Sequence, residues 1–309
     1  MIDKTLLFAI GGIWGLLALA SAIVFAMVKL NPQKNLTELA QRTKSWWVMV
    51  AAFTFAMLTD TIVSFCFIGF ISFLALKEYF SLIPTRREDR RVLFWAYLAI
   101  PLQYYWAGTN WYGMFIIFIP VYMFLFIAFR MIISQKTEGF LNAAATIHWG
   151  LMLCVFAISH AAYLISLTPA GSEKPVGPML LLFLAFLTQF NDVAQYVWGK
   201  SFGKHHILPI VSPKKTWEGF IGGLCTTTLA AFLIAPFLTP FSKPESLFVG
   251  ALIAAAGFIG DVTISSLKRD IGVKDAGSMI PGHGGVLDRV NSLTFAAPLF
   301  LHYTRYFYF

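Results

Sequence analysis

Long apolar runs separated by short polar segments dominate this chain. Each run is close to the ~20 residues that cross a bilayer as a helix, although the second is shorter. The pattern predicts an all-α, polytopic integral membrane protein with about nine to ten transmembrane helices. The runs fall at 6–30, 46–59, 61–83, 92–108, 111–130, 141–167, 178–199, 217–239, 246–265 and 286–308.

Composition excludes a soluble protein. Hydrophobic residues make up 58% of the 309 and charged residues only 12%, whereas soluble domains carry about 25% charged residues. No repeat or long linker interrupts the chain, so we predict a single membrane-integral domain spanning 1–309. Its three cysteines, Cys66, Cys154 and Cys225, each lie inside an apolar run and predict neither a disulfide framework nor a thiolate metal site.

Basic residues alternate between the two sides of the predicted bundle. If the first span starts outside, 19 of the 23 Lys and Arg residues fall in segments on the cytoplasmic side. The other side keeps Lys4, Lys174, Lys243 and Arg305. Positive charge concentrates on the cytoplasmic side of membrane proteins, so both termini are predicted outside. Contact with anionic lipid and phosphorylated substrate explains the net charge of +8 better than nucleic acid does.

Four acids lie near the cytoplasmic ends of late spans, namely Asp192, Glu218, Asp261 and Asp288. Charges at membrane depth are costly and are functional candidates by default. An unpaired carboxylate such as Asp192 inside an apolar span needs a partner cation or metal. We therefore expect these acids to converge on one site facing the cytoplasm.

The densest polar segment runs from residue 260 to 289. Asp261, Ser265 and Lys268 are spaced to share one helix face, which suits a cation bound beside phosphate oxygens. The following Pro-Gly-His-Gly-Gly stretch, 281–285, cannot continue a helix, and its glycines let backbone N–H groups approach an anion. Taken singly, each acid could be an interface anchor, Lys268-Arg269 a positive-inside signal and His283 a structural residue; their clustering favours a site.

A second polar cluster runs from Ser212 to Gly219. One interpretation is a solvated loop that starts a helix with Thr216 or Ser212 as its cap. The other is phosphate binding by Lys214 and Lys215 at a helix N-terminus.

These residues resemble the signature of the phosphatidate cytidylyltransferase (CDP-diacylglycerol synthase) family. The resemblance is specific over roughly 188–295, within the predicted catalytic spans 178–309, and only topological over the N-terminal spans 1–177. The matching motifs are Ser265-x-Leu267-Lys268-Arg269, Lys274-Asp275, Pro281-x-His283-Gly284-Gly285, Asp288-Arg289, Ser212-Pro213-Lys214-Lys215-Thr216-x-Glu218-Gly219 and Asn191-Asp192 followed by Ala194 and Tyr196.

The resemblance implies a Mg²⁺-dependent transfer of a cytidylyl group from CTP to phosphatidic acid or a similar lipid phosphate. Asp261 and Asp288, with Asp192 and Ser265, would hold the metal. The remaining motif residues fall into two groups by implied role. Catalysis and charge neutralisation are implied for Lys214, Lys215, Lys268, Arg269, His283 and Arg289. Nucleotide or cofactor binding is implied for Ser212, Thr216, Glu218, Lys274, Gly284 and Gly285.

One departure from the family pattern is Asn291, where members usually have a second Asp. Asn keeps an oxygen ligand but loses the charge, so the affinity for a second cation is expected to fall. The resemblance also implies a homodimer in the bacterial inner membrane, surrounded by membrane lipids. Two other classes stay open: an ion or solute transporter using Asp192 and Asp261, and an inactive lipid-binding paralogue.

Overall fold

The computed structural model describes residues 4–30, 36–168 and 176–309. Lys34 and Lys174, which enter the charge pattern, lie outside these ranges. The chain is an all-α membrane protein, as the apolar runs predict. Its first half contains α1 (Lys4–Leu30), α2 (Thr37–Leu58), α3 (Thr61–Leu82), η1 (Arg87–Asp89), α4 (Arg90–Gly108), α5 (Tyr112–Ile117), η2 (Phe118–Met123), α6 (Phe124–Ile132), α7 (Phe140–Gly150), η3 (Leu151–Ala157) and α8 (Ile158–Ile165).

Four long helices and a small hairpin form the second half. They are α9 (Gly177–Phe202), β1 (His206–Leu208), β2 (Ser212–Thr216), α10 (Trp217–Leu238), α11 (Lys243–Asp270) and α12 (Leu287–Tyr308). The strands pair antiparallel, with His206 opposite Thr216 and Leu208 opposite Ser212. The sequence did not predict this hairpin, because Ser212–Thr216 carries no alternation of apolar and polar residues.

Two of the first-half helices each contain a π-helical turn. The segments α5, η2 and α6 are continuous, as are α7, η3 and α8. Counted this way, the described residues form ten long helices, one for each apolar run. Seven of these are long and apolar enough to cross a membrane; α2, α4 and α12 fall short because they carry more polar residues. The count of nine to ten spans therefore stays a prediction.

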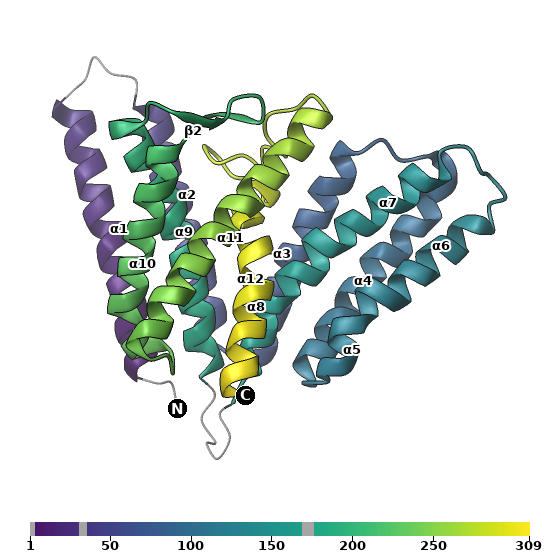
Figure 1. Ribbon diagram of the computed structural model, residues 1–309, viewed down its shortest axis with the longest axis horizontal. Helices are drawn as coiled ribbons and strands as arrows, with labels where there is room; N and C mark the ends of the chain where they lie inside the picture. The colour runs from purple at the N-terminus through teal and green to yellow at the C-terminus, as the bar shows by residue number, and fades with distance from the viewer. Residues whose placement is uncertain (1–3, 31–35, 169–175) are drawn as a thin grey trace.

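Successive long helices run in alternating directions (Figure 1), so the connections lie at two opposite ends of the bundle. The β1–β2 hairpin and the segment between α11 and α12 lie at one end, which we call the hairpin end. The C-terminus and the start of α1 lie at the other end. Helix ends that carry described basic residues assigned to the cytoplasm, such as the last turns of α6 and α11, lie at the hairpin end (Figure 1).

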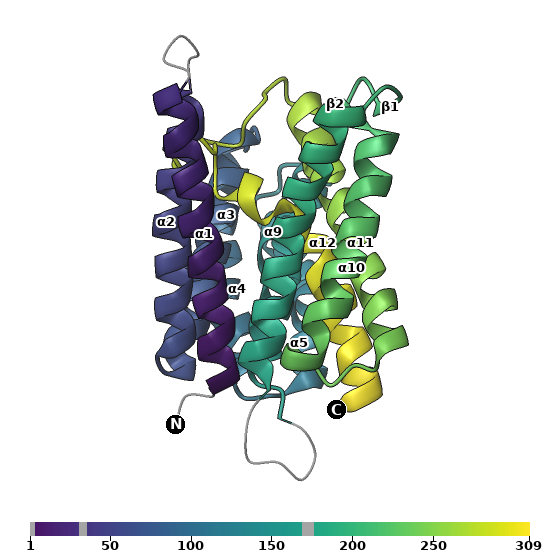
Figure 2. The ribbon, with the colours of Figure 1, turned by 90° about the vertical axis from the view of Figure 1, so that its left-hand side faces the viewer.

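Close packing of α9 to α12 builds the part of the bundle beneath the hairpin. Figure 2 shows α9, α10, α11 and α12 adjacent to one another, with α1 and α2 as a separate pair at the edge. Glycines permit the close approach: a Cβ on Gly223 would lie 2.3 Å from Gln195 of α9, and one on Gly260 would lie 2.3 Å from the Asn291 carbonyl oxygen of α12. Small residues at helix contacts are the usual way for backbones to approach in membranes. These contacts fix the polar positions of the four helices relative to one another.

Candidate functional site

A polar cavity of about 230 Å³ lies beneath the hairpin, between α9, α10, α11 and β2. Two acids from different helices line it, Asp192 of α9 and Asp261 of α11, together with Lys214 and Lys215 of β2. Its other lining residues are Gln195, Tyr196, Ser212, Thr216, Gly219, Phe220 and Phe258. The structure thus brings six of the predicted site residues together: Asp192, Ser212, Lys214, Lys215, Thr216 and Asp261.

The start of α10 explains how β2 reaches this position. Thr216 has extended backbone angles and its hydroxyl accepts a hydrogen bond from the Gly219 N–H at 3.2 Å, so it is the N-cap of α10. An N-cap of this kind satisfies one of the free amides at a helix start. Of the two caps that the sequence allowed, Thr216 is the one observed. The strand before it therefore ends directly over the cavity.

Lys215 and Asp261, which both line the cavity, form an ion pair. The ammonium Nζ lies 2.5 Å from Asp261 Oδ2, and the two side chains are only 18% and 25% exposed. The same ammonium lies 4.7 Å from the centre of the Phe258 ring, an attraction that positions the charge further. A cation is therefore held beside a carboxylate in a largely enclosed space.

Two residues of helix α12 hold the two cavity acids in position through hydrogen bonds. Asn291 donates its Nδ2–H to Asp261 Oδ1 at 2.6 Å. The Ser292 hydroxyl lies 2.9 and 3.0 Å from the two oxygens of Asp192. Asn291, the departure from the family pattern, thus contacts Asp261.

Asp288 lies outside the cavity lining, in the first turn of α12. Its Oδ1 accepts from Lys268 Nζ at 2.6 Å. Its Oδ2 accepts from the Ala276 and Gly285 amides at 2.9 and 3.1 Å. Both oxygens are engaged by protein donors, and the side chain is 6% exposed. In this arrangement Asp288 and Lys268 stabilise the conformation of residues 281–285, which we call the glycine segment. Of the four acids that we expected to converge on one site, only Asp192 and Asp261 line the cavity.

Glu218, the fourth acid, organises the hairpin. Its Oε2 accepts from the backbone amides of Lys204 and His205 at 3.1 and 3.2 Å, and its Oε1 lies 2.5 Å from His205 Nδ1. Arg269 makes a similar contact, donating from Nε to the Val211 carbonyl at 3.2 Å. Both residues act on the backbone that carries β2, and neither lines the cavity.

The remaining predicted site residues also lie away from the cavity lining. Ser265 is half-buried on α11, Lys274 is exposed, and Arg289 is half-buried in the first turn of α12. Gln189 of α9 donates to the Arg289 carbonyl at 3.3 Å, which ties α12 to α9.

His283 is held in the glycine segment against α2. Its ring packs edge-to-face on Trp46 with centroids 6.1 Å apart. Burial, together with the positive charge of Arg289, lowers the pKa of His283 to about 4. The imidazole is therefore neutral at physiological pH. From α2, Ser45 donates to the Pro281 carbonyl at 2.7 Å and Arg42 to the Gly282 carbonyl at 3.0 Å.

Glu78 of α3 is a site-supporting residue that the sequence analysis missed. It is 6% exposed, and its Oε2 accepts from the Leu287 amide at 2.8 Å, at the start of α12. A carboxylate at a helix N-terminus is favourable because it meets free amides and the positive end of the helix dipole. The signal was available, since Glu78 is an acid inside an apolar run, the same criterion that selected Asp192.

Gly284 should be intolerant of a side chain. It has φ of +83°, and a Cβ would lie 2.8 Å from Asp288 Oδ2. Gly284→Ala is expected to lower the free energy of unfolding in detergent by roughly 1–2 kcal/mol from backbone strain, with a further loss from the displaced carboxylate. Gly272→Ala is the matched control, because Gly272 has φ of +74° but nothing within 4 Å of a Cβ. Equal losses in the two variants would contradict the role given to the Asp288 contact.

The donor set of the cavity fits a hard cation. No cluster of three or more His, Cys, Asp or Glu residues occurs in the described ranges, but Asp192 and Asp261 present carboxylates to one space. Mg²⁺ in nucleotide sites is commonly held by one or two carboxylates plus substrate phosphates and waters. The Lys215 ammonium already lies against Asp261, which shows that the position attracts positive charge.

Comparison with known proteins identifies the family. A model of the cytidylyltransferase family matches residues 40–307, well beyond the stretch that carries the motifs. The chain is 41% identical over 306 residues to the uncharacterized protein YnbB of Escherichia coli, covering 99% of each. It is 44% identical over 138 residues to a phosphatidate cytidylyltransferase of Haemophilus influenzae, covering 43% of this chain and 46% of the relative. It is 31% identical over 169 residues to that of Staphylococcus saprophyticus, covering 54% and 61%. The chain thus spans about half the length of these two relatives, and, with a family model covering most of its residues, it belongs to the cytidylyltransferase family.

Proposed function

We propose that this protein is a phosphatidate cytidylyltransferase, which converts CTP and phosphatidic acid to CDP-diacylglycerol and pyrophosphate. The observation that carries the proposal is the cavity in which Asp192, Asp261, Lys214 and Lys215 meet beneath the hairpin. Carboxylates and ammonium groups facing one small space suit a reaction between two phosphate-bearing substrates. Family membership and the two relatives named phosphatidate cytidylyltransferase support this choice of reaction.

In the proposed reaction, a phosphate oxygen of the lipid forms a bond to the α-phosphorus of CTP. The bond from that phosphorus to the bridging oxygen breaks, and pyrophosphate leaves with its electron pair. Such transfers depend on positioning and charge stabilisation. Lys215, fixed by Asp261 and Phe258, would neutralise charge at the reacting phosphate, while the exposed Lys214 would bind the outer phosphates of CTP.

We further propose that Mg²⁺ is the cofactor, held by Asp192 and Asp261. Bound there, it would neutralise negative charge on the triphosphate. Asn291 and Ser292 would orient the two carboxylates through the hydrogen bonds already described. Lys268 and Asp288 would act indirectly, by fixing the glycine segment and the start of α12.

The proposed location is the inner membrane of a bacterium, with the hairpin end facing the cytoplasm. The described basic residues gather at that end, while Lys4, Lys243 and Arg305 fall at the opposite end. This distribution agrees with the positive-inside rule. With the hairpin end in the cytoplasm, the cavity would be accessible to cytoplasmic CTP.

Lys214 gives a test of the nucleotide assignment. Lys214→Met is expected to raise the KM for CTP about ten-fold with little change in kcat, because one charge-assisted contact to phosphate is lost equally in ground and transition states. Lys204→Met is the matched control, since Lys204 is exposed just before the hairpin but does not line the cavity. The same KM in both variants would contradict the assignment.

A second candidate differs only in the lipid acceptor. It is favoured by Asn291, which stands against Asp261 where family members usually have an acid, and by the full-length match to a relative of uncharacterized function. An acceptor panel separates the two candidates: CTP-dependent pyrophosphate release is measured with phosphatidate, lysophosphatidate and a polyprenyl phosphate. The first proposal requires phosphatidate to give the highest kcat/KM. A higher value with another lipid phosphate would favour the alternative.

A further inference from the structure

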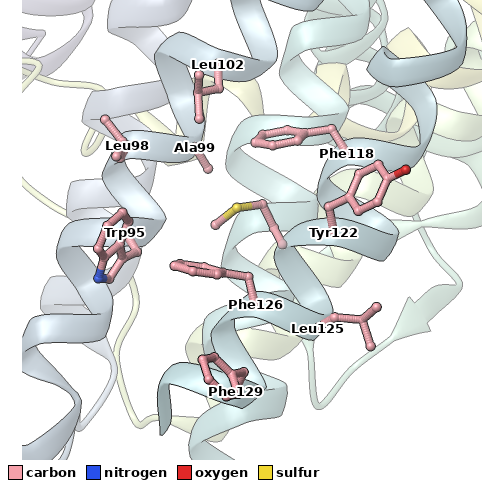
Figure 3. A pocket seen from close by; sticks show the side chains of 10 residues that line it. Trp95, Leu98, Ala99, Leu102, Phe118, Tyr122, Leu125, Phe126 and Phe129 are labelled. Carbon is pink, nitrogen blue, oxygen red and sulfur yellow. The ribbon is translucent and has the colours of Figure 1, made fainter. Parts of the chain in front are cut away.

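An apolar groove of about 550 Å³ lies between α4 and the continuous helix α5–η2–α6, away from the catalytic cavity. Figure 3 shows Trp95, Leu98 and Leu102 of α4 facing Phe118, Phe126 and Phe129 of the other helix across it. The π-helical turn Phe118–Met123 contains Pro120 and forms one wall. None of these residues lines the cavity of Asp192 and Asp261.

The depth of the groove matches one leaflet of a bilayer. It extends along the helix from Phe118 to Phe129, a separation of eleven residue rises or about 16 Å in an α-helix. Half of a hydrocarbon core is about 15 Å. An acyl chain running from the headgroup level to the bilayer centre would therefore fill it.

Arg130 stands at the hairpin end of this groove. It follows Phe129 in the last turn of α6, and its guanidinium carbon lies 6.0 Å from the centre of the Trp95 ring. Its Nε is buried and has no hydrogen-bond partner among the described residues. The two acids just before α4 are engaged elsewhere, Glu88 with Lys136 at 3.9 Å and Asp89 with Arg86 at 2.6 Å.

A buried guanidinium donor without a partner is costly and calls for an acceptor. Phosphate is the acceptor that suits arginine best, through short charge-assisted hydrogen bonds. Arg91 lies four residues before Trp95 on α4, on the same side of that helix by spacing, and adds positive charge. Positive charge therefore occurs at one end of a groove that is otherwise almost wholly apolar.

We propose that this groove is a specific binding site for an anionic glycerophospholipid of the leaflet on the hairpin side. One acyl chain lies between α4 and α5–η2–α6, and the lipid phosphate accepts from Arg130. A second copy of this chain is the less suitable occupant. A two-fold interface would place this groove against itself, and because its lining holds no carboxylate, Arg130 would stay unpaired. The site is separate from the one that binds the reacting lipid.

Native mass spectrometry of the full chain in detergent, titrated with dioleoyl phosphatidylglycerol, tests the phosphate contact. Arg130→Gln is expected to weaken lipid binding about five-fold. This factor corresponds to roughly 1 kcal/mol, the contribution of one arginine near an anionic lipid. Arg90→Gln removes one positive charge at the start of α4, and this variant should bind the lipid as the native protein does. Equal weakening in both variants would mean a general charge effect and would overturn the site.

A groove-filling change tests the acyl chain. Leu102→Trp is expected to weaken phosphatidylglycerol binding at least as much as Arg130→Gln, while Leu233→Trp on the exposed face of α10 leaves it unchanged. An affinity of Leu102→Trp for phosphatidylglycerol equal to that of the native protein would overturn the proposal. A change of oligomeric state in Leu102→Trp with native lipid binding would instead assign the groove to an interface between copies. Equal native affinity for dioleoyl phosphatidylcholine would refute the requirement for an anionic lipid.

Discussion

Asp261→Asn is expected to lower the rate of cytidylyl transfer by about 10²–10³, the usual worth of one group that stabilises transition-state charge. The substitution removes the negative charge that positions Lys215 at 2.5 Å and that would hold Mg²⁺. It keeps the size of the side chain, so the packing of α11 on α12 is preserved. The measurement is kcat for pyrophosphate release with CTP and phosphatidate in detergent.

Asp270→Asn is the matched control for this experiment. Asp270 is the last residue of the same helix, is exposed, and does not line the cavity. Its substitution should leave kcat unchanged. If Asp261→Asn stays within two-fold of the native rate while Asp270→Asn does the same, the cavity is not the catalytic site.

Asn291→Asp is expected to make the stability of the protein dependent on Mg²⁺. The amide that now donates to Asp261 at 2.6 Å would become a second carboxylate, in a position only 7% exposed. Two unit charges about 4 Å apart repel by about 4 kcal/mol at an effective dielectric of 20. Lys215 already pairs with Asp261, so the added charge needs another cation. In EDTA the variant should unfold at lower temperature than the native protein, and Mg²⁺ should restore it.

Asn291→Leu distinguishes the effect of the added charge on stability from the effect of the lost hydrogen bond. It removes the same N–H donor without adding a carboxylate, so its thermal midpoint should not respond to Mg²⁺. Tryptophan fluorescence during heating, with EDTA or with Mg²⁺, reports both variants. Identical curves for the Asp and Leu variants under both conditions would show that position 291 does not act on a cation site.

The sequence predicted the helices well because membrane spans depend on a single strong signal. Each apolar run corresponds to one long helix, and the alternation of basic residues agrees with the alternating helix directions. Boundaries were less accurate: α2 begins at Thr37 instead of near 46, so Arg42 and Ser45 are helical and reach the glycine segment. Polar turns at a helix start lack the apolar pattern that marks the rest of the span.

The sequence identified several residues of the candidate site, but it did not show which of them lie together. Asp192 and Asp261 were selected because acids at membrane depth are costly, and Lys214 and Lys215 because ammonium groups at a helix N-terminus suit phosphate. Spacing along one chain could not show that Asp288 would accept two backbone amides, or that Glu218 would bind hairpin amides. Those contacts depend on how the segments between helices fold back. Glu78 could have been selected as an acid inside an apolar run, but its contact with the start of α12 could not have been predicted.

We propose that a cytidylyl group is transferred to a lipid phosphate in the cavity of Asp192 and Asp261. The most direct test is mass spectrometry of the lipids formed when purified protein is incubated with CTP, Mg²⁺ and phosphatidate, with Asp261→Asn prepared in parallel. We expect a lipid heavier than phosphatidate by one cytidylyl group in the native sample, with only a trace in the variant. Unchanged phosphatidate in the native sample, or the same amount of CDP-lipid in both, would contradict it.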